Sequence, residues 1–367
     1  MNMKIKKQCV FGMLALALLM AIPGLSNAQT QLVYTNATEL TLTGKIGATA
    51  EVYHRVNVDD YPELNNTERT LLTYPTGVAV AFTTNSATVG VKAAYKVRNI
   101  RPNWPEMATA GFDLFIKQDG EWIYAACGVP PKEEGKPVVL INNMDGTVKE
   151  CLLYLPMYSE LESVEIGVAE GAEIAPMADP FRGRILFFGS SYTHGASTSR
   201  AGNSFPSQIG QMTGLGVINI GVSGNSKLQP AFADILGDSD ADAFVIDAFS
   251  NPSAEMIGER FAAFVARLRA AQPGKPIIFL QTIYRERGNF DLKSREYEEN
   301  KREMARKVVA EAMKSDPDIY FVDVPHPTGT DHLTSADGTH PSDLGYYRWA
   351  RAIQPEITKI LSRYGIK

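Results

Sequence analysis

The second half of the sequence alternates between short apolar runs and longer amphipathic segments, and this alternation constrains the fold more than any other feature. Five apolar runs have the length and composition of buried strands: 184–188, 216–220, 243–247, 276–281 and 319–322. Three longer segments carry apolar residues near helical spacing: 253–271, 292–314 and 344–364. Strands that alternate with helices predict a mainly parallel sheet with helices on both faces. We therefore expect an α/β domain over residues 184–367.

Residues 29–173 follow a different pattern, with many short β-rich runs and no long amphipathic helix. The runs are separated by turn residues and lie at 78–82, 87–95, 112–116, 122–124, 138–141, 151–155 and 164–168. The Gln-Asp-Gly sequence at 118–120 has the composition of a hairpin turn. Short strands with regular turn signals predict an all-β sandwich, which we expect to be jelly-roll-like. The proline- and glycine-containing segment 174–183 is interpreted as a linker.

The first 28 residues have the features of a secretory signal peptide. Three lysines precede a 13-residue apolar stretch at 10–22, and small residues surround a predicted cleavage site after Ala28. A membrane-spanning helix needs about 20 apolar residues, so this stretch is short for a span. We expect an exported protein, periplasmic or extracellular, without stable insertion in the membrane.

Charge and cysteine content exclude several classes of protein. The chain has 36 basic and 41 acidic residues, a formal net charge of −5, and loss of the three leader lysines lowers it to −8. No basic block indicates binding to nucleic acid. Cys127 and Cys151 remain after processing, and an oxidising compartment permits either a disulfide or two buried thiols. His326, Asp331 and His332 lack the spacing of a metal site, so we expect no metal and no cofactor.

Four polar segments follow predicted strands of the α/β region, and they contain the candidate catalytic residues. They are Gly-Ser-Ser at 189–191, the segments 219–225 and 247–252, and Asp-Gly-Thr-His-Pro at 337–341. Loops at the carboxyl ends of parallel strands gather at one edge of the sheet, so we expect the four segments to converge. Taken singly, each is typical of a turn or a helix cap, and the glycines at 221 and 224 indicate a turn with positive φ.

The residue types in these segments are those of a serine hydrolase. A serine hydroxyl needs a base to become nucleophilic, and the usual base is a histidine whose ring is oriented by a carboxylate. His340 follows Asp337 by three residues, close enough for the two side chains to meet. A tetrahedral intermediate needs hydrogen-bond donors, which glycine N–H groups and the Asn251 amide can supply. On this reasoning either Ser190 or Ser191 is the nucleophile.

The four segments resemble the four sequence blocks of the SGNH/GDSL hydrolase family, in the same order and with similar spacing. The resemblance covers roughly residues 184–364, and its most specific part is the last block, Asp-x-x-His-Pro followed by Gly345. It implies a three-layer, flavodoxin-like α/β fold. The β-rich region is similar to jelly-roll modules that precede SGNH domains in exported polysaccharide-degrading systems.

The resemblance also implies roles for individual residues. Ser191 would be the nucleophile, and His340 and Asp337 would complete the triad. Ser191, Gly224 and Asn251 would form the oxyanion hole. The resemblance implies no cofactor and no metal, and it names no substrate-binding residue.

Two blocks depart from the family pattern. The family's Gly-Asp-Ser is Gly-Ser-Ser at 189–191, a variant that exported, carbohydrate-active members often show. The family's Gly-x-Asn-Asp is Phe-Ser-Asn-Pro at 249–252, which keeps the asparagine and changes both of its neighbours. The donor is therefore retained, while the loop that walls the site differs.

These features predict an exported serine esterase that works through an acyl-enzyme. By family analogy, its expected partner is an acylated carbohydrate from which it removes O-acetyl groups, or another small ester. A lipid-directed esterase, such as a lysophospholipase or thioesterase, is an alternative, although no amphipathic lid is evident. A glycan-binding protein with a degenerate hydrolase domain is another. The sugar, the position of the ester and the oligomeric state stay open.

Other polar residues near the predicted site have two interpretations each. Arg285 and Arg287 follow the fourth strand of the α/β region, where they would bind an acidic sugar or remain as solvated loop charges. His194 would line the pocket, or serve at the surface or as a cap. The sandwich would bind glycan, or only pack against the catalytic domain.

Overall fold

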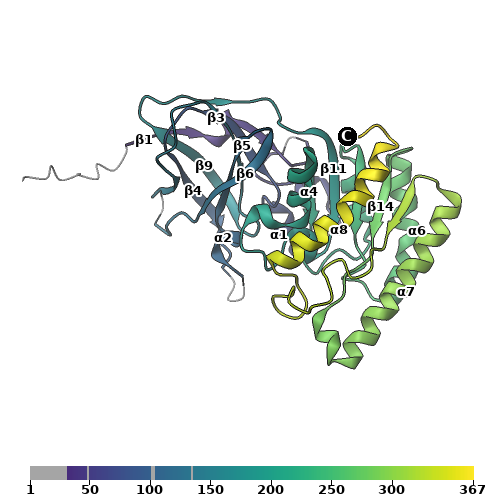
Figure 1. Ribbon diagram of the computed structural model, residues 1–367. Coiled ribbons are helices and arrows are strands. Elements are labelled where there is room, and N and C mark those ends of the chain that lie inside the picture. Colours follow the sequence, from purple (N-terminus) through teal and green to yellow (C-terminus); the bar gives the residue numbers. More distant parts are fainter. Residues whose placement is uncertain (1–30, 48, 101–103, 134) are drawn as a thin grey trace, which may run out of the picture.

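The computed structural model of the chain describes residues 31–47, 49–100, 104–133 and 135–367, so the predicted signal peptide at 1–28 lies outside the described residues. A β-rich part formed by the N-terminal half and an α/β part formed by the C-terminal half lie side by side (Figure 1). Of the helices that the structure describes, none is both long and apolar enough to cross a membrane.

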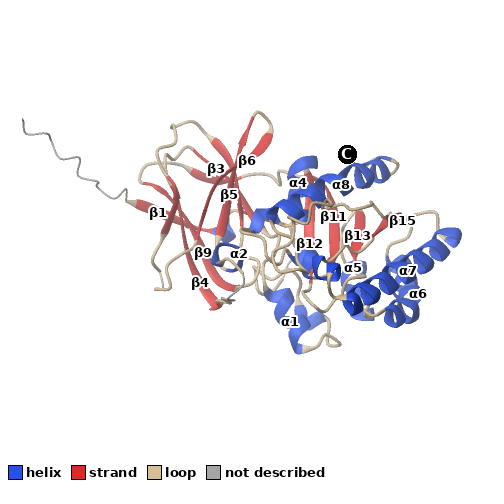
Figure 2. Cartoon of the chain, turned by 60° about the horizontal axis from the view of Figure 1, so that its bottom comes forward, coloured by secondary structure: helices blue, strands red, loops and turns tan. Residues whose placement is uncertain are grey.

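The N-terminal part consists of two antiparallel sheets (Figure 2). The four-stranded sheet has the order β1 (Leu32–Asn36), β9 (Glu160–Ala169), β4 (Val89–Val97), β7 (Val138–Ile141). The six-stranded sheet has the order β10 (Ile174–Pro176), β3 (Ala79–Thr84), β8 (Lys149–Tyr154), β5 (Phe112–Gln118), β6 (Glu121–Gly128), with β2 (Thr41–Thr43) also paired to β3. Apolar side chains of both sheets form one core, among them Phe82, Val91, Leu114 and Ile166. The predicted all-β sandwich is confirmed, and it also contains two short helices, α1 (Asn66–Thr73) and α2 (Glu106–Thr109).

Two segments of the sandwich show how local sequence sets local structure. Asp119 and Gly120 join β5 to β6 with φ of 53° and 85°, because a tight hairpin loop of this kind needs positive φ at both positions. The predicted linker at 174–183 is partly regular structure. It begins with β10, which pairs with β3, and its last two residues start β11 (Arg182–Gly189).

The central strands β3 and β8 of the six-stranded sheet are buried on both faces over most of their length. Val80 and Phe82 of β3 belong to the core between the two sheets, whereas Ala79 and Ala81 belong to a core that is shared with the α/β part. Successive residues of a strand point to opposite faces, which explains why β3 is apolar without alternation. The two parts therefore meet through a continuous apolar contact.

The C-terminal part is a three-layer α/β domain. Its five strands are parallel and have the order β12 (Leu215–Gly221), β11, β13 (Ala243–Asp247), β14 (Ile277–Leu280), β15 (Ile319–Val322). Helices α4 (Phe205–Thr213) and α8 (Asp343–Ser362) cover one face, and α5 (Pro230–Gly237), α6 (Ala254–Ala271) and α7 (Leu292–Ser315) cover the other. This is the predicted flavodoxin-like order, in which β12, the second strand of the domain along the chain, lies at the edge of the sheet.

The helices that the sequence predicts are those whose apolar stripe spans several turns. The first turn of α6 is capped by the Ser253 hydroxyl, which accepts the Met256 N–H at 3.2 Å. Its buried residues are Ile257, Phe261, Phe264, Val265 and Leu268. Helices α4 and α5 have 9 and 8 residues, so they complete too few turns to show a helical period in the sequence.

The strand order changes direction next to β11, and this places the candidate site. The chain passes from β11 to β12 on one side and then crosses to β13 on the other. Gly189 at the end of β11 pairs in register with Asp247 at the end of β13. In open α/β sheets, ligands bind at such a switch point, outside the carboxyl ends of the strands.

Candidate active site

Ser191 lies at a sharp turn from β11 into the one-turn helix α3, which ends at His194. Glycine is needed at position 189, because a Cβ there would lie 2.2 Å from the Thr193 hydroxyl oxygen. Ser190 caps the helix, and its hydroxyl accepts a backbone N–H of the first turn at 3.1 Å. The turn leaves Ser191 half-buried at the edge of the sheet.

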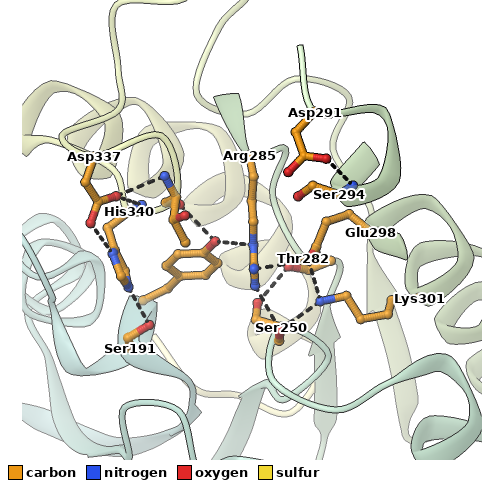
Figure 3. Close-up of polar contacts among 12 residues, drawn as sticks. Ser191, Ser250, Thr282, Arg285, Asp291, Ser294, Glu298, Lys301, Asp337 and His340 are labelled. Carbon is orange, nitrogen blue, oxygen red and sulfur yellow. Dashed lines mark hydrogen bonds and ion pairs between the residues drawn. The ribbon is translucent and has the colours of Figure 1, made fainter. Parts of the chain in front are cut away.

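His340 and Asp337 lie in the loop between β15 and α8, and the structure brings both to Ser191 (Figure 3). His340 Nε2 is 2.9 Å from Ser191 Oγ, and His340 Nδ1 is 2.8 Å from Asp337 Oδ2. The other carboxylate oxygen accepts the backbone N–H groups of Thr339 and His340 at 2.9 and 2.7 Å. The three predicted residues therefore form a continuous hydrogen-bonded chain, and its carboxylate is held by its own loop.

Asp337 is kept ionised by its surroundings. Partial burial acts to raise its pKa, but hydrogen bonds from the backbone and ring of His340 and from the Thr339 N–H outweigh burial and hold the pKa below its ordinary value. A carboxylate that stays charged favours a proton on Nδ1 of the neighbouring imidazole and a lone pair on Nε2, which faces the serine. This arrangement can accept the proton of the serine hydroxyl.

The turn that carries His340 is supported from two neighbouring elements. Tyr192 is buried, its ring lies edge-on to the imidazole with 5.8 Å between centroids, and its hydroxyl donates to the Thr339 carbonyl at 3.0 Å. Arg287 is exposed, and its backbone N–H donates to the Gly338 carbonyl at 3.0 Å. The position of the imidazole is therefore set by packing and by backbone hydrogen bonds.

Gly224 and Asn251, the other predicted donors, lie on two loops that touch each other. Gly224 has a φ of 76°, as predicted, whereas Gly221 is needed for space, because a Cβ there would lie 2.2 Å from the His194 nitrogen. The Asn251 side-chain oxygen accepts the N–H and the hydroxyl of Ser226 at 3.3 and 3.1 Å, which joins the loop after β12 to the loop after β13. Both hydrogen bonds are accepted by the oxygen of the Asn251 amide, whereas an oxyanion would be bound by its nitrogen. The role of both residues as oxyanion donors stays a prediction.

Asp247, at the end of β13, is absent from the predicted site, yet it organises the same loops. It is buried and accepts hydrogen bonds from the hydroxyls of Ser190 at 2.8 Å, Thr193 at 3.0 Å and Ser250 at 3.4 Å. Burial raises its pKa to about 6, although these hydrogen bonds act in the opposite direction. Ser190 thus has a definite role, because an aspartate at its position would place a second carboxylate against Asp247.

Arg285 is held within the protein, so both of its predicted interpretations are wrong. Its guanidinium donates to the Tyr192 hydroxyl at 3.0 Å and to the Ser250 carbonyl at 2.9 Å, and it pairs with Glu298 at 3.1 Å (Figure 3). Glu298 also pairs with the buried Lys301 at 2.8 Å, and Lys301 donates to the same carbonyl at 2.9 Å. Burial lowers the pKa of Lys301 to about 8. Two cations that share one carboxylate therefore fix the loop after β13.

His194 lies in the interface between the two parts of the molecule, so the predicted pocket, surface and cap roles are wrong. It is fully buried, and its Nε2 is 2.8 Å from both the Thr76 hydroxyl and the Met157 carbonyl oxygen. Its ring stacks on Tyr158, with centroids 3.9 Å apart and planes 5° apart. The sandwich therefore contacts the short helix that carries Ser191.

Cysteines and metal-binding residue types form no site in the part of the chain that the structure describes. Cys127 and Cys151 are free thiols, so the disulfide alternative is wrong, and burial raises the pKa of each to about 12. Over the described ranges, no three His, Cys, Asp or Glu side chains gather as a metal site needs. His332 pairs with Glu286 at 2.8 Å, and Asp331 pairs with Arg348 at 2.8 Å.

The fold and the loops at its carboxyl edge define a class of protein, the SGNH hydrolases. Their architecture is the parallel sheet seen here, in the order β12-β11-β13-β14-β15, with helices on both faces and a serine after β11. Residues 182–358 match the model of the GDSL-like lipase/acylhydrolase family, and residues 32–174 match the model for the N-terminus of SGNH hydrolase-type esterases. The chain belongs to the GDSL-like lipase/acylhydrolase family, as the sequence resemblance predicts.

Several solved structures are similar to this chain. A protein from Bacteroides ovatus described as a GDSL-like lipase is 41% identical, with a TM-score of 0.86 over 90% of this chain and 98% of that one. A salicylyl-acyltransferase from a tetracycline biosynthetic pathway is 18% identical, with a TM-score of 0.73 over 92% and 99% of the two chains. A family two carbohydrate esterase from Clostridium thermocellum, in complex with cellohexaose, is 14% identical, with a TM-score of 0.56 over 78% and 93%. The last two show likeness of fold alone. The comparison with curated proteins found no match.

Proposed function

We propose that the protein is an exported serine esterase in which Ser191 is the nucleophile, His340 the general base and Asp337 the residue that orients the histidine. The observation that carries this proposal is the hydrogen-bonded chain, with steps of 2.9 and 2.8 Å, that links the three side chains at the carboxyl edge of the sheet. Export is proposed from the predicted signal peptide at 1–28.

The proposed reaction has two halves. In the first, His340 Nε2 accepts the Ser191 hydroxyl proton while Oγ attacks the ester carbonyl carbon, and the N–H groups of Ser191 and Gly224 and the Asn251 amide bind the oxyanion. Collapse expels the alcohol, which takes the proton from His340, and leaves an acyl-enzyme. In the second half, His340 deprotonates a water that attacks the acyl carbon, the bond between that carbon and Ser191 Oγ breaks, the acid leaves, and Oγ takes the proton back from His340. Asp337 stabilises the imidazolium in both halves.

For the substrate, we propose an O-acetylated carbohydrate. Solved structures similar in fold include family two carbohydrate esterases and an acetyl xylan esterase from Butyrivibrio proteoclasticus. Fold does not fix substrate, so this part of the proposal depends on that analogy together with the predicted export signal.

The test compares wild type with Ser191→Ala and Ser190→Ala on 4-nitrophenyl acetate, on a long-chain 4-nitrophenyl ester and on acetylated xylo-oligosaccharides, with acetate release as the readout. We expect Ser191→Ala to lower kcat at least about 10³-fold, because the other triad members cannot replace the nucleophile. Ser190→Ala keeps the nucleophile and serves as the matched control.

Three outcomes would contradict parts of the proposal. Equal turnover by Ser191→Ala and wild type would show that Ser191 is not the nucleophile. Preference for the long-chain ester would favour the lipid-directed alternative. Absence of turnover in every protein, with glycan binding retained, would favour a binding module with a degenerate hydrolase domain.

A further inference from the structure

A groove of about 950 Å³ lies between the sandwich and the α/β domain, outside the proposed ester site. One wall is the hairpin of β5 and β6, and the other is formed by α4 and α8. Ser191, Asp337 and His340 do not line it. A cleft of this size between two domains is typical of a ligand site, and the proposed mechanism does not account for it.

Aromatic side chains from both domains line the groove. Trp122 and Tyr124 belong to β6, and Tyr347 belongs to α8. Tyr124 and Tyr347 are 47% and 50% exposed, and the Arg200 guanidinium lies over the Tyr124 ring at 3.9 Å from its centroid. The Tyr347 ring and the uncovered part of the Tyr124 ring are therefore open to a ligand. The face of an aromatic ring is electronegative and attracts the partly positive C–H groups on the face of a sugar ring. The amides of Asn203 and Gln211 also line the groove and can bond to sugar hydroxyls.

The groove is basic, although the protein as a whole is acidic. Its basic residues are Lys117, Arg182, Arg200 and Arg351, and its one acidic residue is Glu121, whereas the chain has a net charge of −5. Lys117 is paired with the Glu150 carboxylate at 2.8 Å, and Arg200 is paired with the buried Asp113 carboxylate at 2.7 Å. Arg182 and Arg351 are exposed, and neither forms an ion pair with another described residue. Guanidinium groups bind carboxylates through two parallel hydrogen bonds, so these two arginines favour a carboxylated ligand.

We propose that the groove binds an acidic oligosaccharide, a sugar chain that carries uronate carboxyl groups. The rings of the sugars would lie on the aromatic side chains, and the uronates would pair with Arg182 and Arg351. Tyr347 lies in the first turns of α8, which begins three residues after His340. This binding function goes beyond ester hydrolysis.

Titration calorimetry on the wild-type protein tests the proposal, with an unacetylated oligogalacturonide and a cello-oligosaccharide of the same length as probes. We expect the acidic probe to bind at least tenfold more tightly than the neutral one, with an affinity that falls as salt is raised. Arg351→Gln and Tyr347→Ala should each weaken binding at least fivefold. Arg363→Gln, which changes an exposed arginine of the same helix region outside the groove, is the matched control.

The proposal is overturned if neither probe binds, if the two bind equally, or if the groove variants match Arg363→Gln. Hydrolysis of 4-nitrophenyl acetate should stay within twofold of wild type in Arg351→Gln and Tyr347→Ala. An inactive wild type would contradict the proposed esterase function and leave the calorimetric result standing, so the two failures are distinguishable.

A second observation is independent of the groove and concerns a buried arginine of the sandwich. Arg55 is 0% exposed, and its guanidinium donates to the carbonyls of Asn219 at 2.7 Å, Gly221 at 2.9 Å and Leu71. Among the residues that the structure describes, no carboxylate pairs with it. Burial lowers its pKa to about 9. A buried cation that is compensated by carbonyl oxygens alone is costly, which indicates that its position is needed.

Two of the three carbonyls that Arg55 binds, those of Asn219 and Gly221, belong to the end of β12, where the loop that carries Gly224 begins. The Asn219 side chain donates to the Thr193 carbonyl of α3 at 2.8 Å and accepts the Gly221 N–H at 2.9 Å. The strand end held by Arg55 is therefore bonded to the helix that carries the proposed nucleophile and continues into the loop of a proposed oxyanion donor.

A second contact from the sandwich reaches the same loop. The Tyr158 hydroxyl is 2.9 Å from the Ser223 hydroxyl, one residue before Gly224. We infer that Arg55 is a positioning residue, through which the sandwich sets the geometry of the oxyanion site. This inference rests on the proposed function, because it concerns the same reaction.

The test measures kcat and KM of Arg55→Lys and Arg55→Ala on 4-nitrophenyl acetate, with circular dichroism as the check of folding. We expect kcat to fall at least about 30-fold in Arg55→Ala with KM nearly unchanged, because a misplaced donor affects the transition state more than ground-state binding. Arg55→Lys, which keeps the charge and some of the donors, should recover part of the loss. Arg98→Ala removes a half-buried arginine of the sandwich that pairs with Glu106, and it should keep wild-type kcat.

Full kcat in a folded Arg55→Lys and a folded Arg55→Ala would refute the positioning role. A rise of KM alone would also refute it. An inactive wild type would instead contradict the proposed esterase function.

Discussion

Two aspartates lie near Ser191 at the carboxyl edge of the parallel sheet, and their environments differ. Asp337 is on a solvent-accessible loop, where hydrogen bonds hold its pKa below the ordinary value. Asp247 is fully buried, and burial raises its pKa to about 6. Environments that push two carboxyl groups apart in pKa indicate different tasks. The negative charge of Asp337, which faces the imidazole, is stabilised. The buried carboxyl group of Asp247 instead accepts hydrogen bonds from hydroxyls of the neighbouring loops.

The comparison separates the proposed chemistry from its scaffold. Asp337 acts on Ser191 through the His340 ring, whereas Asp247 acts on the backbone around it through Ser190, Thr193 and Ser250. Substitutions at the first aspartate should therefore change activity far more than stability. Substitutions around the second should change stability and its pH dependence.

The largest effect is expected at the exposed aspartate. Asp337→Asn should lower kcat on 4-nitrophenyl acetate by about 10³- to 10⁴-fold, because an amide favours the wrong imidazole tautomer and cannot stabilise the imidazolium. The melting temperature should stay within a few degrees of wild type. Asp331→Asn, an exposed aspartate of the same loop that pairs with Arg348, is the matched control. If Asp337→Asn retained more than a tenth of wild-type kcat, the proposed catalytic role that distinguishes Asp337 from Asp247 would be wrong.

A smaller effect, visible in stability, is expected at the buried aspartate. Its pKa is raised from 3.8 to about 6 on folding, so the folded protein holds the proton more tightly and loses stability as pH rises through this window. Asparagine cannot ionise, so the free energy of unfolding of Asp247→Asn should rise relative to that of wild type between pH 4 and pH 7. The expected difference is up to about 3 kcal/mol, which corresponds to a shift of two pKa units. Denaturant unfolding of both proteins at several pH values measures this difference. Parallel pH curves for the two proteins would count against the raised pKa.

The smallest effect is expected at Ser190, which precedes Ser191 and donates a hydrogen bond to Asp247. Ser190→Ala removes a helix cap and one hydrogen bond to Asp247, which should lower the free energy of unfolding by about 1 kcal/mol. Ser191, the proposed nucleophile, is kept, so kcat should stay within tenfold of wild type. Denaturant unfolding and 4-nitrophenyl acetate hydrolysis measure the two quantities. A loss of kcat as large as that of Asp337→Asn would show that the cap is part of the chemistry.

The sequence predicts the parts of the fold that have a long apolar pattern or that follow from the topology of a parallel sheet. The predicted strands at 243–247 and 319–322 have the observed bounds, because parallel strands covered by helices on both faces are nearly uninterrupted apolar runs. Ser191, Asp337 and His340 are brought together because a parallel sheet places all its carboxyl ends at one edge. Helices α4 and α5 are too short to be recognised from periodicity.

The buried polar residues of the site are harder to predict, because residue type does not reveal depth. The sequence allows a surface position for both Arg285 and His194, whereas the structure buries His194 fully and holds the half-buried Arg285 by internal hydrogen bonds. The sequence of α7 contains one signal of this burial. Glu298 and Lys301 fall on the same helical face as Ala305 and Val309, so a pair of charges continues an apolar stripe. Charged residues at stripe positions indicate a buried ion pair rather than a solvated face.

The two central strands of the six-stranded sandwich sheet, β3 and β8, have apolar residues on both faces, and this limits how such a protein can change. Cutting the chain between β10 and β11 would leave an open apolar surface on each half, because Ala81 and Leu152 face the core of the α/β part. Fragments of that kind associate with each other or with other chains rather than remain as independent units. The two halves are therefore not interchangeable modules. Recombination that gives the hydrolase a different accessory domain must also replace the surface that receives it.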